Sequence, residues 1–549
     1  MKSSLKLVCC YFHKHLRPHI VLISICICVY IYLYKFRPPI QKCLVPPSSS
    51  KDDRAVSTNM TSCGLTDDGD NCCPPMPSTE IKDFKLPSQS SPMRVRPAAH
   101  LADEKYIAKY KEAIRRMKAL PDEDPLSFKQ QANLHCAYCN GAYSQVGYPH
   151  CQVHIHYGWL FFPFHRYQLY FFEKILGMLL EDPTFAIPFW NWDNPPGMKM
   201  PDMFVEDSNS SLYDVLRNAD HLRKVVDCNY NVGDETYSSP QESQESQESI
   251  NLKTIYRQMV SNSKNAELFY GSAYRAGDCD ARNGSYGGPV ENCPHNTIHS
   301  WCGDPKNGEE DMGIFATAAR DPIFYSHHGN VDRMWIIWRE NITTDPEKRK
   351  CVEDSKDWLD ANFIFYDENR QPVRAYVRDS LDYEKLGYVY EKVDIPWFNE
   401  KPTPRKSKKS KKPAVEFPVV LDKVISAVVA RPNNSTRRDD KEEVLVIEGI
   451  EFEKDEAVKF DVHINDDEDS PCGPENTEFA GSFVHVQHSH THGKKKTKKM
   501  NSALRLGITD LLKDLEADGD DTVLVTLVPR KGLVTIRGIV IELISCSGK

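Results

Sequence analysis

Two groups of histidines have the spacing expected of metal ligands. His295 and His299 lie four residues apart, which on a helix places both imidazole rings on one face. His328 follows in a later segment, four residues before Asp332. A second group lies upstream and comprises His135, His156 and His165. Three imidazoles in each group, with no cysteine or carboxylate among them, suit a borderline metal that changes oxidation state, and copper fits this requirement.

Seven sequence blocks surround and follow these histidines: HCAYC, WLFFPFHR, PFWNWD, HNTIH, DPIFYSHHGNVDRMW, DWLD and KFDV. On these blocks the chain resembles the plant polyphenol oxidases, which comprise tyrosinases, catechol oxidases and aurone synthases with type-3 copper centres. The resemblance extends over about residues 60–549. An HxxxH pair by itself would be weak evidence, because surface helices often carry such pairs, whereas seven blocks in the family's order are specific.

The resemblance implies a centre of two copper ions with six histidine ligands. Copper A would be bound by His135, His156 and His165, and copper B by His295, His299 and His328. The neighbouring residues His154 and His327 are not expected to bind metal, and Asp332, one turn after His328, is placed to orient a ring.

The cysteines indicate covalent bracing of the same region. Cys63, Cys72 and Cys73 cluster as in a disulfide staple of an oxidising compartment, with buried free thiols as the alternative. The resemblance implies the disulfides Cys63–Cys73 and Cys72–Cys136, and a thioether between Cys139 and His156 that would hold the imidazole rigidly. Cys293 and Cys302 could form a disulfide or remain thiols.

The activity implied by the resemblance is oxidation of o-diphenols to o-quinones with O₂, because a pair of coppers exchanges two electrons at once. Glu291 matches the position of a glutamate that binds a water in the family, and Asn296 matches the residue that polarises this water. Phe315 matches an aromatic gate residue that stacks on the substrate. These residues are also compatible with hydroxylation of monophenols, whose hydroxyl has a pKa of about 10 and needs a base. The structural alternatives are a surface carboxylate for Glu291, an amide on a helix surface for Asn296 and an aromatic core residue for Phe315.

Two other function classes compete with a phenol oxidase. A reversible oxygen-binding type-3 copper protein without phenol turnover would use the same ligands, but the DWLD and KFDV blocks argue against it. A structural copper protein at a membrane would have lost a ligand, and none is lost. The net charge of −9 gives no sign of nucleic-acid binding, so the expected partners are a small phenolic substrate and O₂. The sequence does not indicate an oligomeric state.

The N-terminal segment favours entry into the secretory pathway. Residues 20–34 form an apolar run that follows four basic residues, as in a signal segment. The run is shorter than the roughly 20 residues of a relaxed span, so a cleaved signal and a membrane anchor both remain open, with the anchor slightly favoured. We expect a lumenal or vacuolar protein, and six N-x-S/T sequons agree with a glycoprotein. A plastid is less expected, because no Ser-rich transit peptide or twin-arginine signal is visible.

Composition divides the chain into six segments. Residues 1–45 are expected to be the signal or anchor. Residues 46–62 are rich in Pro, Ser and Asp and are expected to form a flexible stalk. The copper-binding catalytic domain covers residues 63–345, and the DWL segment 346–400 closes it. A basic, proline-bounded linker follows at 401–414, before a C-terminal domain at 415–549. The repeat QESQESQES at 241–249 is expected to be a solvated loop.

The hydrophobic period changes at the linker. Before it, helical periodicity predicts a mainly α catalytic domain, a four-helix bundle whose core holds the metals. After it, alternation with period two predicts a small all-β sandwich of about seven strands. The resemblance implies that this domain covers the copper site and keeps the enzyme latent, as a zymogen, until the domain is displaced, and we expect cleavage in 401–414 or mild detergent to raise activity. The histidines of HVQHSHTHG could bind metal, but an exposed loop is expected there.

Overall fold

The computed structural model describes residues 54–545, except 67–68, 78, 232–244, 280–282, 406–414, 434–436, 438–440, 467–469 and 490–497. The expected N-terminal signal or anchor, most of the basic linker, and His490 and His492 of the histidine-rich loop lie outside the described residues. Within the described part of the chain, no helix is both long enough and apolar enough to cross a bilayer.

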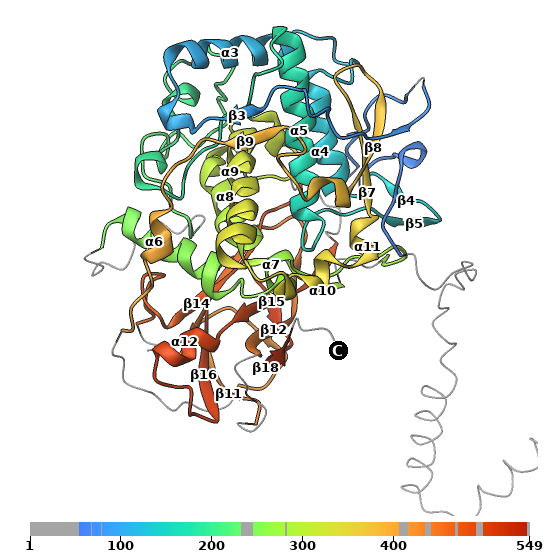
Figure 1. Ribbon diagram of the computed structural model, residues 1–549. Helices are drawn as coiled ribbons and strands as arrows, with labels where there is room; N and C mark the ends of the chain where they lie inside the picture. The colour runs from blue at the N-terminus through green and yellow to red at the C-terminus, as the bar shows by residue number, and fades with distance from the viewer. Residues whose placement is uncertain are drawn as a thin grey trace, which may run out of the picture. The chain divides into compact units, whose positions relative to one another are not determined.

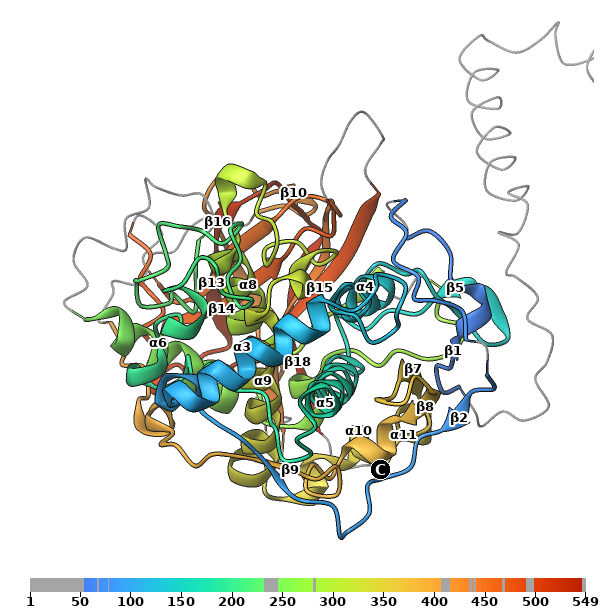
Figure 2. The ribbon, with the colours of Figure 1, turned by 90° about the horizontal axis from the view of Figure 1, so that it is seen from above.

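Four helical segments form the centre of the catalytic region (Figure 1). They are α4 (Phe128–Cys139), α5 (Phe161–Leu180), α9 (Ile323–Ile337), and the π-helical turn η6 (Glu291–Asn296), which continues into α8 (Thr297–Cys302). The helix α3 (Glu104–Lys118) packs across α5 and α4, as Figure 2 shows from above. The expected helical bundle is confirmed.

The sequence explains where these helices begin and end. Ser127 caps α4 by accepting a hydrogen bond from the backbone N–H of Gln130, and Asp103 caps α3 in the same way. The helix α5 is apolar and aromatic on nearly every side, so it is buried along almost its whole length. It ends at Glu181, which adopts the left-handed conformation common at helix ends.

Short elements close the catalytic region. The DWL segment forms a hairpin of β7 (Asn362–Tyr366) and β8 (Pro372–Tyr376), and β9 (Tyr388–Tyr390) pairs in parallel with β3 (Arg94–Arg96). The remaining elements are β1 (Thr58–Asn59), β2 (Lys82–Asp83), β4 (Ser144–Gln145), β5 (Tyr148–Gln152), α6 (Gln247–Tyr256), α7 (Ala266–Tyr270), β6 (Asn283–Ser285), α10 (Lys350–Glu353) and α11 (Lys356–Leu359).

The C-terminal residues form two antiparallel sheets. One has the order β11 (Ile425–Ala430), β16 (Thr522–Lys531), β13 (Val458–Ile464), β14 (Phe479–His485). The other contains β10 (Val419–Val420), β17 (Thr535–Ile536), β12 (Glu442–Glu453), β15 (Lys499–Gly507) and β18 (Gly538–Ile544). A short helix, α12 (Thr509–Asp514), precedes β16. Side chains from both sheets share one hydrophobic core, which confirms the all-β sandwich.

The catalytic region and the sandwich are joined through backbone and side chains. The strand β6 of the catalytic region pairs in parallel with β15 of the sandwich. Tyr157, which follows His156, lies in the hydrophobic core of the sandwich rather than in that of the helices. The residue beside a predicted copper ligand is therefore fixed by the C-terminal domain.

Two expectations about flexible segments are wrong for their described parts. Residues 54–62 do not form a stalk: β1 pairs with β4, and Val56 and Met60 are buried. The Pro/Ser-rich composition that suggested a stalk ends before these alternating apolar residues. The end of the QES repeat is helical rather than a loop, because Ser246 caps α6 by accepting from the N–H of Ser249.

Candidate metal centre

The first histidine group converges from two helices and a loop. His135 lies on α4, His165 on the first turns of α5, and His156 in the loop before α5. Their ring centroids are 5.3–5.6 Å apart. The Nδ1 atoms of His135 and His165 contact the carbonyls of Phe315 at 3.0 Å and Phe161 at 2.8 Å. These contacts orient both rings with Nε2 inward, and among the described residues neither Nε2 has a hydrogen-bond partner.

The second group comes from η6, α8 and α9. The ring of His295 lies 4.6 Å from that of His299 and 4.9 Å from that of His328, between centroids. Nδ1 of His299 contacts the Met312 carbonyl at 2.7 Å, and its Nε2 lies 3.3 Å from Nε2 of His328. His327 also has a ring nitrogen within the same cluster.

The two groups face each other across one buried space. The rings of His165 and His328 stack with centroids 4.3 Å apart, and those of His156 and His295 lie 6.1 Å apart. Removal from water lowers the pKa of His165 to about 3 and of His299 to about 4, and holds the pKa of His135 well below its ordinary value. These three rings are therefore neutral at physiological pH, with lone pairs available to a metal.

The donor set fits two copper ions. Every candidate donor is an imidazole nitrogen, the rings are buried, and Nε2 of His135, His165 and His295 is without a hydrogen bond among the described residues. A buried polar nitrogen without a partner is unfavourable unless a ligand satisfies it. Two facing sets of imidazoles could hold the two ions of a dinuclear centre. The fold and site define a dinuclear copper protein with an all-histidine centre.

Glu291 is buried beside this centre. Its Oε1 accepts a hydrogen bond of 2.6 Å from the N–H of Tyr157, while Oε2 has no hydrogen-bond partner among the described residues. Burial raises the pKa of its carboxyl to about 8, although the backbone N–H of Tyr157 acts in the opposite direction. The carboxyl is thus held in a dry environment with one oxygen available to a water or a substrate hydroxyl.

Asn296 connects the centre with the sandwich. Its Oδ1 lies 2.9 Å from Nδ1 of His295, and its Nδ2 donates to the carbonyl of Val484 in β14 at 3.0 Å. The side chain therefore positions the ring of His295. Its expected action on a water stays a prediction.

Phe315 stacks on a candidate ligand and is itself covered. Its ring lies 4.3 Å from that of His156 with an interplanar angle of 6°. The N–H of Phe315 donates to the carbonyl of Gln487, and the rings of Phe315 and His488 form a T-shaped pair with centroids 5.2 Å apart. His485 and His488 are buried, so the expectation of an exposed histidine loop is wrong for these two residues. Residues 486–489, named here the covering segment, occupy the space over the gate.

The cysteines near the site are either paired in disulfides or buried. The structure contains the disulfides Cys63–Cys73 and Cys72–Cys136, and also Cys151–Cys279, for which the sequence indicated no pairing. Cys139 is buried, with Sγ 3.5 Å from the carbonyl of Phe315, the residue whose ring stacks on His156. Cys293 and Cys302 are buried free thiols rather than a disulfide.

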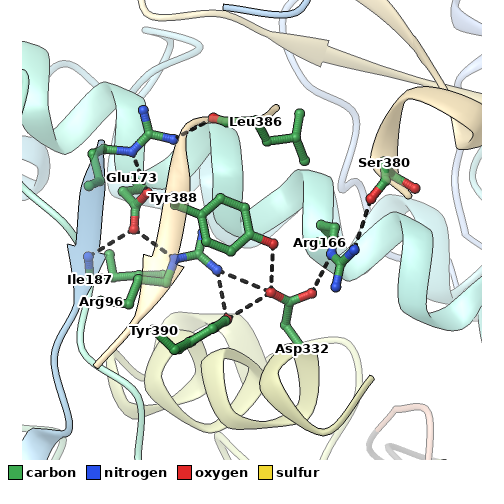
Figure 3. Close-up of polar contacts among 10 residues, drawn as sticks. Arg96, Arg166, Glu173, Ile187, Asp332, Ser380, Leu386, Tyr388 and Tyr390 are labelled. Carbon is green, nitrogen blue, oxygen red and sulfur yellow. Dashed lines mark hydrogen bonds and ion pairs between the residues drawn. The ribbon is translucent and has the colours of Figure 1, made fainter. Parts of the chain in front are cut away.

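The expectation that Asp332 orients a ligand ring is wrong. Figure 3 shows its carboxylate between two arginines and two tyrosines. Oδ1 accepts from Nε of Arg166 at 2.6 Å, and Oδ2 accepts from the hydroxyls of Tyr388 and Tyr390 at 2.7 Å each. Arg96 reaches the same oxygen at 3.3 Å and also binds Glu173. Sequence reasoning missed this network, because its members are distant along the chain and each one looks like an ordinary charged residue.

Comparisons with known proteins agree with the site. Residues 125–341 match the family model described as the common central domain of tyrosinase, 353–403 the polyphenol oxidase middle domain, and 417–543 the chloroplastic polyphenol oxidase C-terminal domain. A chloroplastic polyphenol oxidase of Malus domestica is 54% identical over 501 residues, covering 86% of this chain and 81% of the relative. The chloroplastic (+)-larreatricin hydroxylase of Larrea tridentata is 50% identical over 491 residues, with the same two coverages.

A solved structure of latent apple tyrosinase matches with a TM-score of 0.75 and 52% identity, covering 85% of this chain and all of that one. The chain therefore belongs to the tyrosinase and polyphenol oxidase family. It is a copper oxidoreductase with a type-3 dinuclear centre that oxidises o-diphenols with O₂. The comparisons give no support to the oxygen-carrier alternative.

The expected secretory localisation is contradicted. The relatives from Malus domestica and Larrea tridentata are named chloroplastic, as are those from Prunus armeniaca and Ipomoea batatas, which points to the plastid. The basic segment and the apolar run at the N-terminus indicate translocation without specifying the compartment. Sequons arise often by chance and add little. The comparisons also lend no support to a membrane anchor.

Proposed function

We propose that the chain is a plastid polyphenol oxidase in which His135, His156 and His165 bind one copper and His295, His299 and His328 the other. The observation that carries this assignment is the convergence of six buried imidazoles around one space. His327 lies in the same cluster, but His328 is preferred, because its Nε2 approaches that of His299 and its ring stacks on His165. A thioether between Cys139 and His156 is part of the proposal.

Bound copper would supply the electron transfer, so that two o-diphenols reduce one O₂ to two waters. The protein supplies positions and proton acceptors. Phe315 offers an aromatic face beside His156, on which a phenol ring can stack. In its ionised form, which the raised pKa of about 8 favours only as the pH approaches that value, Glu291 can accept a hydroxyl proton through its free oxygen, directly or through a water. Burial of both groups keeps bulk water away from the developing quinone.

We further propose that the C-terminal domain keeps the enzyme latent through the covering segment. Residues 487 and 488 accept hydrogen bonds from the N–H groups of Phe315 and Ala316, at 3.1 and 3.2 Å. Asn140, on the other side of the site, exchanges hydrogen bonds with the ring and the carbonyl of His488. The ring of His488 packs against that of Phe315 with centroids 5.2 Å apart, so a phenol ring that approaches Phe315 has to displace this segment.

The function is tested by turnover with two substrates. Copper-loaded protein, after cleavage in residues 401–414 and separation of the C-terminal domain, should consume O₂ and form quinone from 4-methylcatechol. Oxygen uptake with tyramine, without added diphenol, then decides whether monophenols are hydroxylated. A loaded, cleaved enzyme that turned over neither substrate would contradict the assignment as a phenol oxidase.

A further inference from the structure

A second group of potential metal ligands lies in the C-terminal sandwich, separate from the six histidines. His463 is near the end of β13, Asp466 follows it, and Cys472 lies in the next described segment. All three side chains are buried, with exposed fractions of 0%, 1% and 3%. Their ligand atoms lie within 4.8 Å of one another. Cys472 is a free thiol.

The distances in this group are close to those around a tetrahedral cation. Nδ1 of His463 lies 2.9 Å from Oδ2 of Asp466 and 3.7 Å from Sγ of Cys472. Around tetrahedral zinc, nitrogen–oxygen and nitrogen–sulfur edges are about 3.3 and about 3.6 Å, given the usual bond lengths. Only the carboxylate has to withdraw, by a few tenths of an ångström. The N–H of Cys472 donates to Oδ2 at 2.8 Å and so orients the carboxylate.

We propose that His463, Asp466 and Cys472 bind one zinc ion as a third metal of the protein. One nitrogen, one oxygen and one sulfur donor suit zinc and exclude magnesium and calcium, which require oxygen ligands. Three protein ligands leave a fourth position for water. Binding requires Nδ1 of His463 without its proton, which in the neutral ring moves to Nε2, while the thiol proton of Cys472 leaves to solvent.

The proposed zinc would brace the segment that holds the start of the linker. The carbonyl of Ser470 accepts from Nη1 of Arg405 at 2.9 Å, and the N–H of Thr477 donates to the carbonyl of Thr403 at 2.9 Å. The carbonyl of Asn476 accepts from Arg257 of the catalytic region at 2.7 Å. Fixing Cys472 to His463 therefore restrains residues 470–477, and with them residues 403–405 and a contact between the two domains.

The test uses the full-length protein, first loaded with copper and then titrated with Zn²⁺ or, as a spectroscopic probe, Co²⁺. Copper is expected to stay in the histidine centre, because it binds such ligands more tightly than zinc or cobalt. We expect two coppers and one zinc per chain, and a thiolate-to-cobalt charge-transfer absorption with Co²⁺. Cys472→Ser should abolish this absorption and the third metal, while Cys228→Ser, which removes another buried thiol, should retain both.

A wild-type protein that retained only two metals, or bound cobalt without thiolate absorption, would show that His463 and Asp466 are merely a hydrogen-bonded pair. Retention of two coppers by Cys472→Ser verifies that the variant folds, and Asp466→Asn serves if it does not. Zinc-loaded wild type should also be cut by trypsin in residues 401–414 several-fold more slowly than zinc-free protein. Equal rates would overturn the bracing role.

Discussion

At the residue scale, burial determines the chemistry of the site. The imidazoles are neutral because desolvation disfavours their charged forms, and the same effect holds the Glu291 carboxyl in an unusual state. The six histidines that the motifs singled out lie together in the structure, and their assignment as copper ligands stays a prediction. The motifs misassigned Asp332. Its position one helical turn from a ligand does not show where its carboxylate binds, and in the structure it pairs with two arginines that are distant along the chain.

Glu291→Gln should reduce turnover without loss of metal. The amide keeps the size of the side chain but cannot accept a proton, so kcat on a phenolic substrate should fall about 10²-fold or more. Copper content should stay at that of wild type, because Glu291 is not among the candidate ligands. Steady-state oxygen uptake together with metal analysis checks both points, and wild-type turnover in the variant would exclude a proton-accepting role.

At the element scale, buried ion pairs hold α5 and α9 against β3 and β9. Asp332 of α9 meets Arg166 of α5 and Arg96 of β3, and the tyrosines of β9 complete its coordination (Figure 3). The periodicity of the sequence predicted the helices and the sandwich strands. Periodicity could not predict the ion-pair network of Asp332 or the pairing of β6 with β15. Both join segments that are far apart along the chain, and periodicity reports only on neighbouring residues.

Asp332→Asn should destabilise the fold strongly. Two buried arginines would lose a charged partner, a change that costs about 3–5 kcal/mol when a buried pair is broken. Asp202→Asn, which affects an exposed pair with Arg223, should change the free energy of unfolding by less than about 1 kcal/mol. Urea unfolding of both variants measures the contrast, and similar small losses in both would refute a structural role for the network.

The strand β12 carries a carboxyl whose ionisation opposes folding. Burial raises the pKa of Glu442 to about 7 from an ordinary value of 4.5, so the unfolded chain binds fewer protons than the folded protein between these values. Stability should therefore fall as the pH rises from about 4.5 through about 7 and then level off. Glu442→Gln should be more stable than wild type by about 3 kcal/mol at about pH 8 and equal to it at about pH 4.

The matched control for this pH dependence is Glu448→Gln, an exposed position on the same strand. It should leave the difference between the two pH values unchanged. Thermal or urea unfolding at both pH values provides the comparison, and a Glu442→Gln gain that persisted at acidic pH would point to packing instead of ionisation.

At the scale of the whole molecule, the sandwich and the catalytic region form a covered active site. The covering segment accepts a hydrogen bond from the backbone N–H of Phe315, and β14 accepts one from the side chain of Asn296. Tyr157 lies in the hydrophobic core of the sandwich. The family resemblance predicted a shielding domain, but the sequence did not show which residues shield. From the sequence, His485 and His488 are expected to lie in an exposed loop, because a histidine-rich sequence lacks the hydrophobic pattern that indicates burial.

Removal of the sandwich should activate the enzyme. Cleavage within 401–414 followed by separation of the C-terminal domain removes His488 from the gate, so the rate with 4-methylcatechol should rise several-fold. Protein cut at the linker but retaining the sandwich is the control and should stay near the rate of the intact chain. Equal rates for intact protein and for protein shown to lack the domain would reject latency.

The most direct test of the central claim is a count of copper ions combined with electron paramagnetic resonance of the oxidised protein. Six imidazoles around one space predict two coppers per chain whose Cu(II) spins couple, so the spectrum should be silent despite the full copper content. A ratio below two after complete loading, or the full signal of isolated Cu(II) ions, would contradict the dinuclear centre.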